Sequence, residues 1–161
     1  MKNISFLLLI LFLNVDCVIF NSDYKIENRE KSESEKFHEL LSEQWEKGIV
    51  RNPERASSLG DNRFNDKLND TSYETIMKRQ GETRELQETV KKIDRSKLSE
   101  DDQLNYDLYL HGIEKQIEGF QFLSYLIPID QMGGIQIGFA GISNYMPFNN
   151  VKDYENYLAR M

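Results

Sequence analysis

Apolar residues recur every three or four positions along much of this chain, and this spacing predicts a succession of helices. The first helix is expected to begin near Ser32 or Ser34 and to stop at Gly48, because glycine commonly ends helices. Its apolar face combines Phe37, Leu40, Leu41 and Trp45. A single apolar stripe on an otherwise charged helix is typical of a helix that packs on its neighbours along one side.

A second, short helix is predicted to open at Asn52-Pro53-Glu54, because proline at the first helical position has no N–H group to leave unpaired. Gly60 is expected to end it, and residues 61–70 form a polar connector. Thr71 or Ser72 then caps a third helix. The predicted buried side of the third helix consists of Tyr73, Ile76, Met77, Leu86, Val90 and Ile93.

The longest helix is predicted to open at Ser99, where Ser99 and Asp102 resemble a capping box with aspartate in place of glutamate. It is expected to run until Pro128, which cannot continue a helix. Its apolar stripe combines Leu104, Leu108, Ile113, Ile117, Phe120 and Leu123, and is widened by Tyr106, Tyr109 and Leu110. A stripe of this width predicts burial on more than one side.

Residues 128–148 differ in kind, because they are apolar, glycine-rich and nearly uncharged, and they predict an extended segment. Asn149 or Asn150 is expected to cap a last helix with Val151, Tyr154 and Leu158 on it. That helix has run about three turns at Met161, with no glycine after it, so we expect the sequence to be cut. The expected fold is all-α, a helical array of about five helices with a Gly-rich extended segment, and part of a larger, mainly helical fold.

Residues 1–22 have the pattern of an export signal. Lys2 precedes a ten-residue apolar run, which is too short for a bilayer span of roughly 20 residues. Cleavage before Val18 would export the chain, whereas acylation of Cys17 would make it a lipoprotein, although Asp16 is unlike the small residue a lipobox places there. An uncleaved apolar N terminus is the third alternative. The chain is therefore expected in the periplasm or cell envelope, with membrane contact only through the signal or a lipid anchor.

The remaining chain divides into a charged lead-in and a helical portion. Residues 23–33 are nearly free of apolar side chains and predict a flexible lead-in, whereas 34–161 predict the N-terminal helical portion of a larger domain. The formal net charge is −7, and no stretch is strongly basic, which excludes a nucleic-acid-binding surface. With Cys17 as the only cysteine, no internal disulfide can form.

Two histidines are the first candidates for chemistry. His38-Glu39 begins like the zinc motif HExxH, but Ser42 stands where the second histidine would be, so an exposed histidine is favoured. His111 has Asp107 and Glu114 within one helical turn, and could bind a metal or act as a base. A solvated surface cluster is favoured for His111, and no Ser-His-Asp or Cys-His set is identifiable.

Two segments remain. Residues 133–141 are glycine-rich but lack the spacing of GxGxxG and the lysine of a phosphate loop, so they predict a segment along a cleft or a buried loop under the helices. Residues 53–72 carry several carboxylates, but nothing around them is apolar enough to promise the dry setting that acid–base chemistry needs. A structural connector is favoured for this stretch.

Several short segments occur in a fixed order from about residue 34 to the end. They are the helix with Phe37, Leu40 and Trp45, and the segments 52–63, 68–72, 98–106, 128–134 and 148–160. Their order and spacing resemble the N-terminal part of a bacterial family named "domain of unknown function 885". Members look like exported or lipid-anchored helical zinc metallopeptidases whose HExxPGH-like motif lies beyond the point at which this chain ends.

The resemblance implies a role for this chain without a catalytic residue or metal ligand in it. Zinc is implied for the full-length family, and no residue here matches the motif that would hold it. Residues Gln131, Gly133, Gly134 and Gln136 are expected to line the substrate cleft. A peptide-like substrate is expected only in the full-length protein, which makes this chain part of the cleft wall of an exported metallopeptidase-like hydrolase.

Two alternatives stay open. One is a stand-alone helical binding module or surface lipoprotein without enzymatic activity. The other is an enzyme complete in this length, with His111 and its neighbouring carboxylates as the catalytic groups.

Overall fold

The computed structural model describes residues 29–161, which are helical apart from their connectors and contain no strand. The α-helices of this range are α1 (Glu33–Arg51), α2 (Pro53–Ser58), α3 (Tyr73–Lys91), α4 (Glu100–Gly119), α5 (Ile135–Gly141) and α6 (Val151–Arg160). They confirm the predicted all-α class. Cys17 and the predicted export signal lie outside the described residues. No helix within 29–161 is both long and apolar enough to cross a membrane.

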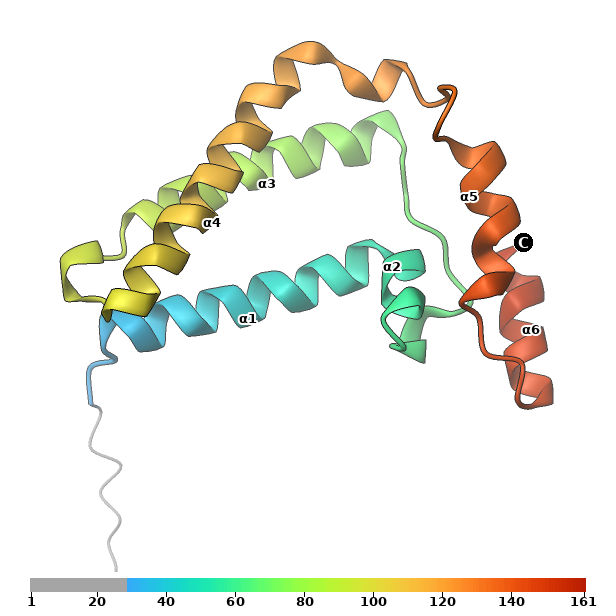
Figure 1. Ribbon diagram of the computed structural model, residues 1–161, viewed down its shortest axis with the longest axis horizontal. Coiled ribbons are helices and arrows are strands. Elements are labelled where there is room, and N and C mark those ends of the chain that lie inside the picture. The colour runs from blue at the N-terminus through green and yellow to red at the C-terminus, as the bar shows by residue number, and fades with distance from the viewer. Residues whose placement is uncertain (1–28) are drawn as a thin grey trace, which may run out of the picture. The chain divides into compact units, whose positions relative to one another are not determined.

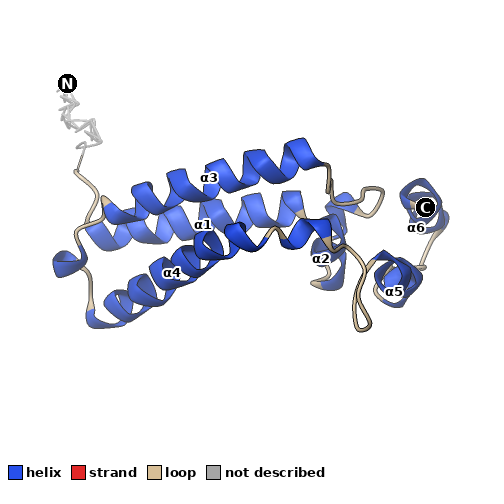
Figure 2. Ribbon diagram, turned by 90° about the horizontal axis from the view of Figure 1, so that it is seen from above, coloured by secondary structure: helices blue, strands red, loops and turns tan. Residues whose placement is uncertain are grey.

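Three long helices, α1, α3 and α4, share one apolar core, and Figures 1 and 2 show them alongside one another. The buried residues of this core are Phe37, Val90, Leu98, Tyr106 and Ile113. Phe37 is fully buried, and its ring centroid lies 5.9 Å from that of Tyr106 and 6.4 Å from that of Tyr109. Removal of this apolar surface from water is the main stabilising contribution in this part of the molecule.

Helix α1 begins where the sequence predicts and ends later. Ser32 and Glu35 form a complete capping box at its N terminus. The helix does not stop at Gly48 but continues to Arg51. Ile49, one residue beyond the glycine, is 3% exposed, and this burial outweighs the cost of about 1 kcal/mol that glycine imposes on a helix interior.

Helix α4 has the predicted start and an unexpected end. The hydroxyl of Ser99 accepts a hydrogen bond from Asp102 N at 3.2 Å. The helix ends at Gly119 instead of continuing to Pro128, and the 3₁₀ turns η3 (Phe120–Phe122) and η4 (Ser124–Leu126) follow. Leu123 between these turns has a left-handed φ of 50°, which an α-helix cannot contain.

The buried faces of α3 and α4 are narrower than predicted. Tyr73 in α3 is 58% exposed, and Leu104 and Leu108 in α4 are 60% and 62% exposed. The predicted stripe of α4 therefore combined residues of two sides, of which only the side with Tyr106 and Ile113 faces the core. Periodicity alone could not separate the two sides, because apolar residues occur on both.

The segment 128–148 is not extended throughout, which corrects the prediction. It contains α5 and the 3₁₀ turn η5 (Ile142–Asn144). Near its start, Ile129 and Gly134 form an isolated antiparallel bridge. Asn150 then caps α6 in a complete capping box with Asp153, as the sequence predicts.

Candidate functional site

The short helix α2 places two oppositely charged side chains on different surfaces. Asn52 closes α1, with its N–H donating to Gly48 O at 3.2 Å, and α2 starts at the next residue. Ala56 and Ser57 are buried and hold α2 against the molecule. Glu54 and Arg55 are consecutive, so their side chains leave the helix about 100° apart. Each of the two lines a pocket of its own.

A cluster of buried polar side chains holds α2 in place. The hydroxyl of Ser57 lies 2.5 Å from Asn65 Oδ1 and 3.0 Å from Pro53 O. Asn65 is 1% exposed, and its Nδ2 donates to Asn62 Oδ1 at 2.9 Å. These bonds tie α2 to the connector that follows it, which is why the polar stretch after Pro53 has a defined conformation.

Arg160 of α6 inserts into this cluster and is 2% exposed. Its Nη2 donates to Phe64 O at 2.6 Å and to Ser57 Oγ at 2.9 Å, and its Nη1 lies 3.2 Å from Met146 Sδ. Burial lowers the pKa of Arg160, and the nearby charge of Glu54 opposes that effect. The guanidinium makes no ion pair with any residue of the described range. The buried charge of Arg160 is therefore compensated mostly by hydrogen bonds to neutral oxygens. The bond to Ser57 also joins α6 to α2.

The first pocket, here called the Glu54 pocket, has a volume of about 600 Å³. It is lined by Glu54, Leu68, Asn69, Thr71, Ile76, Tyr125, Pro128, Gly138, Phe139, Ile142 and Tyr145. Glu54 is its one ionised lining residue, and Glu54 Oε1 accepts a hydrogen bond from Asn69 N at 3.0 Å. Its other carboxylate oxygen has no hydrogen-bond partner within residues 29–161. Burial raises the pKa of the Tyr145 hydroxyl, which keeps it a neutral donor.

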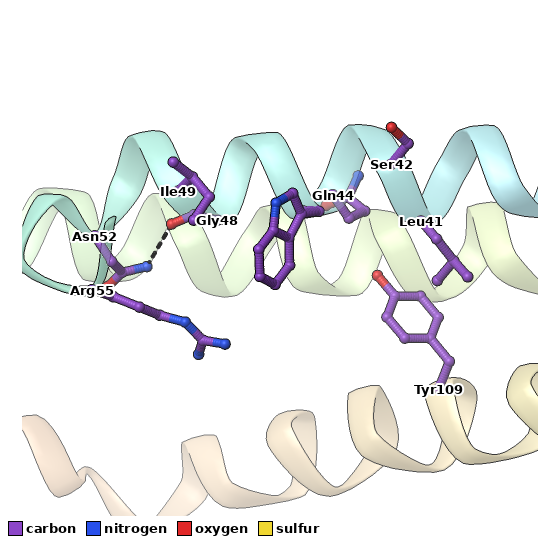
Figure 3. A pocket seen from close by; sticks show the side chains of 9 residues that line it. Leu41, Ser42, Gln44, Gly48, Ile49, Asn52, Arg55 and Tyr109 are labelled. Carbon is purple, nitrogen blue, oxygen red and sulfur yellow. Dashed lines mark hydrogen bonds between the residues drawn. The ribbon is translucent and has the colours of Figure 1, made fainter. Parts of the chain in front are cut away.

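The second pocket, here called the Arg55 groove, has a volume of about 590 Å³ and lies between α1, α2 and α4. It is lined by Leu41, Ser42, Gln44, Trp45, Gly48, Ile49, Asn52, Arg55 and Tyr109. Figure 3 shows the Arg55 guanidinium and the Tyr109 hydroxyl directed into the space between α1 and α4. The guanidinium carbon of Arg55 lies 6.0 Å from the ring centroid of Trp45. Arg55 is the one ionised side chain that lines this groove.

The comparisons with known proteins identify a family. Residues 53–161 match the model of a family described as a bacterial protein of unknown function (DUF885). This chain belongs to the DUF885 family. No curated protein and no solved structure matches it. The DUF885 match confirms the family resemblance over residues 53–161. The description of the family carries no activity, so the likeness to zinc metallopeptidases stays a prediction.

The two pockets differ in their relation to the DUF885 segment. Every residue that lines the Glu54 pocket lies inside 53–161, from Glu54 to Tyr145. Most of the Arg55 groove is formed by α1, which precedes the matched segment, and only Arg55 and Tyr109 belong to it. The Glu54 pocket is therefore the candidate site that belongs entirely to the family portion of the chain.

The four residues predicted to line a cleft lie close together, three of them in a tight turn and Gln136 in the first turn of α5. Asp130 Oδ1 accepts from Met132 N at 2.7 Å and from Gly133 N at 2.6 Å. Gln136 Nε2 donates to Gly133 O at 3.0 Å, and Gln131 is exposed. None of Gln131, Gly133, Gly134 and Gln136 lines either pocket, while their neighbours Pro128 and Gly138 line the Glu54 pocket. Their contact with a substrate stays a prediction.

Gly134 has a conformational reason to be glycine. Its φ of +126° is one that other residues rarely adopt, and a Cβ there would lie 2.4 Å from Gln136 Oε1 and 3.0 Å from Pro128 O. A side chain at this position would therefore strain the turn and displace Gln136. It precedes α5 directly and so determines where that helix begins.

The two histidines lie apart from both pockets. His38 Nε2 lies 2.7 Å from Asp102 Oδ1, and this contact joins α1 to the first turn of α4. His38 is exposed, as predicted, although it has this carboxylate partner. His111 is exposed too, and its neighbour Asp107 pairs with Arg95 at 2.7 Å. The carboxylate of Asp107 is therefore paired with Arg95 and not with His111.

The donor set that zinc requires is missing from the described range. Within residues 29–161, no three or more His, Cys, Asp or Glu side chains are grouped so that they could hold a metal ion. Zinc sites in enzymes use three protein ligands and one open position. The side chains of the described range thus do not fit the zinc that the resemblance implies for the full-length family.

Three residues of these sites were not anticipated from the sequence. Glu54 and Arg55 belonged to a stretch interpreted as a connector, and Arg160 was given no role. One available signal was the pair of opposite charges directly after the proline that opens α2. No local signal marks Arg160, because its oxygen partners are about a hundred residues away in the sequence.

Proposed function

We propose that this chain forms a peptide-binding part of the substrate cleft wall in an exported hydrolase of the metallopeptidase type, and that it does not hold the metal. One observation carries the proposal: a pocket of about 600 Å³ with largely apolar walls and a single carboxylate lies wholly in the family segment. Ligand pockets of this size with few polar groups are typical of specific small-molecule or side-chain binding.

The lining of the Glu54 pocket suits a peptide with a free amino group next to an aromatic or aliphatic side chain. Phe139, Ile142 and Ile76 offer apolar contact, and the rings of Tyr125 and Tyr145 can lie against a cation. The unpaired oxygen of Glu54 can accept a hydrogen bond from an ammonium group, and a charge-assisted bond of this kind is stronger than a neutral one. The pocket thus supports binding and orientation of the peptide.

A titration by two-dimensional NMR tests this assignment. The probe is phenylalanylglycine amide, which has a free amino group and no carboxylate, and its N-acetylated form is the comparison. We expect saturable shifts at the amides of Asn69 and Gly138 with the free amine only. Glu54→Gln should weaken this binding about tenfold, the value of one charge-assisted hydrogen bond.

Glu74→Gln is the matched control, since Glu74 is exposed on α3 and outside the pocket. It should leave the affinity for the free amine unchanged. Equal binding of the amine and the acetylated probe, or equal loss in both glutamate variants, would contradict the proposal. So would shifts that map only to other surfaces.

The second part of the proposal concerns the metal. Purified chain incubated with zinc should neither retain a stoichiometric metal ion nor hydrolyse a fluorogenic peptide. Metal content by mass spectrometry and the cleavage rate are the two measurements. Stoichiometric zinc together with unaided cleavage would refute the idea that the chemistry lies outside this chain. A His111→Ala variant that kept such a cleavage activity would in turn remove His111 as its base.

Export is the third part, and it rests on residues outside the described range. The positive start, the short apolar run and Cys17 support a cleaved signal or a lipid anchor. Fractionation of cells that express the full sequence should place the protein in the envelope. Cys17→Ala would abolish labelling by a lipid precursor if the anchor is real and would leave simple export intact. A cytoplasmic, uncleaved product would contradict both.

The alternative function is a helical binding module without enzymatic activity. It predicts the same titration result at the Glu54 pocket, because binding requires no catalytic group. The two proposals are distinguished by the peptide hydrolysis that the full-length gene product shows with and without the Glu54→Gln substitution. Loss of peptide hydrolysis in a Glu54→Gln protein supports the hydrolase, and a cell extract with unchanged hydrolysis supports the binding module.

A further inference from the structure

The Arg55 groove carries a second set of polar groups that the proposed function does not use. The guanidinium of Arg55 makes no hydrogen bond or ion pair with any described residue, and its carbon lies 6.0 Å from the ring centroid of Trp45. The side-chain amide of Gln44 and the hydroxyl of Tyr109 likewise have no hydrogen-bond partner in residues 29–161. Three donors that line one pocket are therefore available to a ligand.

The charge in the groove has one sign. The protein is acidic overall, with a net charge of −7, yet no aspartate or glutamate lines this pocket. Two other exposed arginines of this part of the chain are paired with carboxylates: Arg63 binds Glu46 and Asp61, and Arg95 binds Asp107. An arginine left without a carboxylate in a chain rich in carboxylates suits a ligand that brings its own.

The walls restrict what the ligand can be. Leu41, Ile49 and the half-exposed Trp45 provide an apolar and aromatic surface beside the guanidinium. The planar fork of one arginine matches one carboxylate in a bidentate arrangement, with a single charge on each side. A phosphate dianion would need further cations, and none lines the groove. Charge and shape together favour a carboxylate attached to an aromatic or aliphatic group.

We propose that the Arg55 groove binds the carboxylate of a peptide C terminus or of a peptide side chain, with the adjoining apolar group against Trp45. Arg55 holds the carboxylate, and the hydroxyl of Tyr109, which lines the same groove, is a further donor for the ligand. Figure 3 shows both side chains directed into the same space. This site is independent of the Glu54 pocket and does not rest on the function proposed for it.

The single tryptophan makes the test direct, because Trp45 is the chain's one indole and lines the groove. N-acetylphenylalanine is the probe, and its amide is the uncharged comparison. Neither has a free amino group, so neither satisfies the Glu54 pocket. We expect the acid to change the Trp45 emission saturably and the amide to have no effect. The affinity of the acid should fall as salt is added, since the interaction is exposed and ionic.

Arg55→Gln should weaken the binding of the acid about tenfold or more, because one charge-assisted contact is lost. Arg84→Gln is the matched control: Arg84 also lies over an aromatic ring, that of Phe120 at 5.2 Å, but outside the groove. Calorimetry provides a readout that does not depend on the indole. Arg55→Lys should bind with intermediate affinity, which a merely structural role of Arg55 does not predict.

Two peptides then identify the source of the carboxylate. One ends in a free C-terminal phenylalanine, and the other is amidated and carries a glutamate beside the phenylalanine. Tighter binding of either one supports the site and names its ligand. Equal binding of acid and amide probes, unchanged affinity in Arg55→Gln, or displacement of the acid by inorganic phosphate at the same concentration would overturn the proposal.

Discussion

The Glu54 pocket and the Arg55 groove have nearly the same volume, and the neighbouring residues Glu54 and Arg55 each line one of them. The two pockets are nevertheless built from different elements. The groove is formed mainly by α1 and Tyr109 of α4, whose positions the apolar core determines. The Glu54 pocket draws on α2, α3, η4 and the segment from Pro128 to Tyr145, close to the polar cluster around Arg160.

This difference separates two ways of positioning a binding residue. Apolar burial is non-directional, so the core fixes Tyr109 through the general packing of its neighbours. Hydrogen bonds are directional, and Arg160 must meet Phe64 O and Ser57 Oγ at specific angles for α6 to dock. We therefore expect each pocket to fail under a different kind of substitution.

The largest loss of stability should come from a substitution in the apolar core. Phe37→Ala removes a fully buried ring from the core and should lower the free energy of unfolding by about 3–5 kcal/mol. Because the ring of Phe37 contacts that of Tyr109, the Arg55 groove should lose more of its ligand affinity than the Glu54 pocket does. Urea denaturation measures the stability, and Phe37→Leu gives a milder variant that stays folded. A loss below about 1 kcal/mol would show that the core is not built around this ring.

The next largest loss of stability should come from a substitution in the polar cluster around Arg160. Arg160→Ala leaves Phe64 O and Ser57 Oγ without their donor, which should cost about 2–3 kcal/mol of stability in the same measurement. Here the Glu54 pocket should be impaired and the Arg55 groove retained, the reverse of the first variant. Arg84→Ala, on the exposed side of α3, should change the stability by less than about 0.5 kcal/mol. Equal damage to both pockets would argue against two separately supported sites.

A smaller loss is expected at the turn before α5. Gly134→Ala forces a side chain onto a positive φ and against Gln136 Oε1, which should cost about 1–2 kcal/mol. The Glu54 pocket should bind its probe more weakly, because Gly138 and Phe139 of α5 would shift. Gly81→Ala is the informative contrast, since a Cβ at Gly81 meets nothing within 4 Å and the substitution should stabilise α3.

The smallest effect concerns pH and the contact between α1 and α4. The hydrogen bond from His38 is the main reason that the pKa of Asp102 lies below its usual value. A carboxylate with a lowered pKa stabilises the fold above its unfolded pKa, near 4, and this contribution is lost as the pH falls through the folded pKa. The melting temperature should therefore drop less with acid in Asp102→Asn than in the wild type. Asp101→Asn, at the exposed neighbouring position, should keep the wild-type pH dependence.

Local signals were sufficient for most helix starts. Serines at 32, 72 and 99 and Asn150 accept hydrogen bonds from the first turns of their helices, as the sequence predicts. These interactions span three residues, so sequence contains them in full. Helix ends were less predictable, because Gly48 lies inside α1 and Gly119 ends α4 well before Pro128.

The candidate sites could be predicted only in part. Pro128 and Phe139 of the segment 128–148 line the Glu54 pocket, whereas Gln131, Gly133, Gly134 and Gln136 do not, and the predicted position of these four residues in a substrate cleft stays a prediction. The family resemblance, and not a local property, pointed to those four residues. Which surfaces Glu54 and Arg55 line cannot be read from their local sequence, because both pockets are formed by segments that are distant in the sequence.

The sequence by itself determined that this chain is helical, where most helices begin, and that it belongs to the DUF885 family, because caps, apolar periodicity and motif order are all written in short stretches. Only the tertiary structure decided which apolar residues are buried, and that Arg160 reaches Ser57 and Phe64 across the fold. It also decided that two adjacent charges on α2 serve two pockets. Burial and pairing depend on contacts between distant segments, and a linear pattern contains no information about which segments will meet.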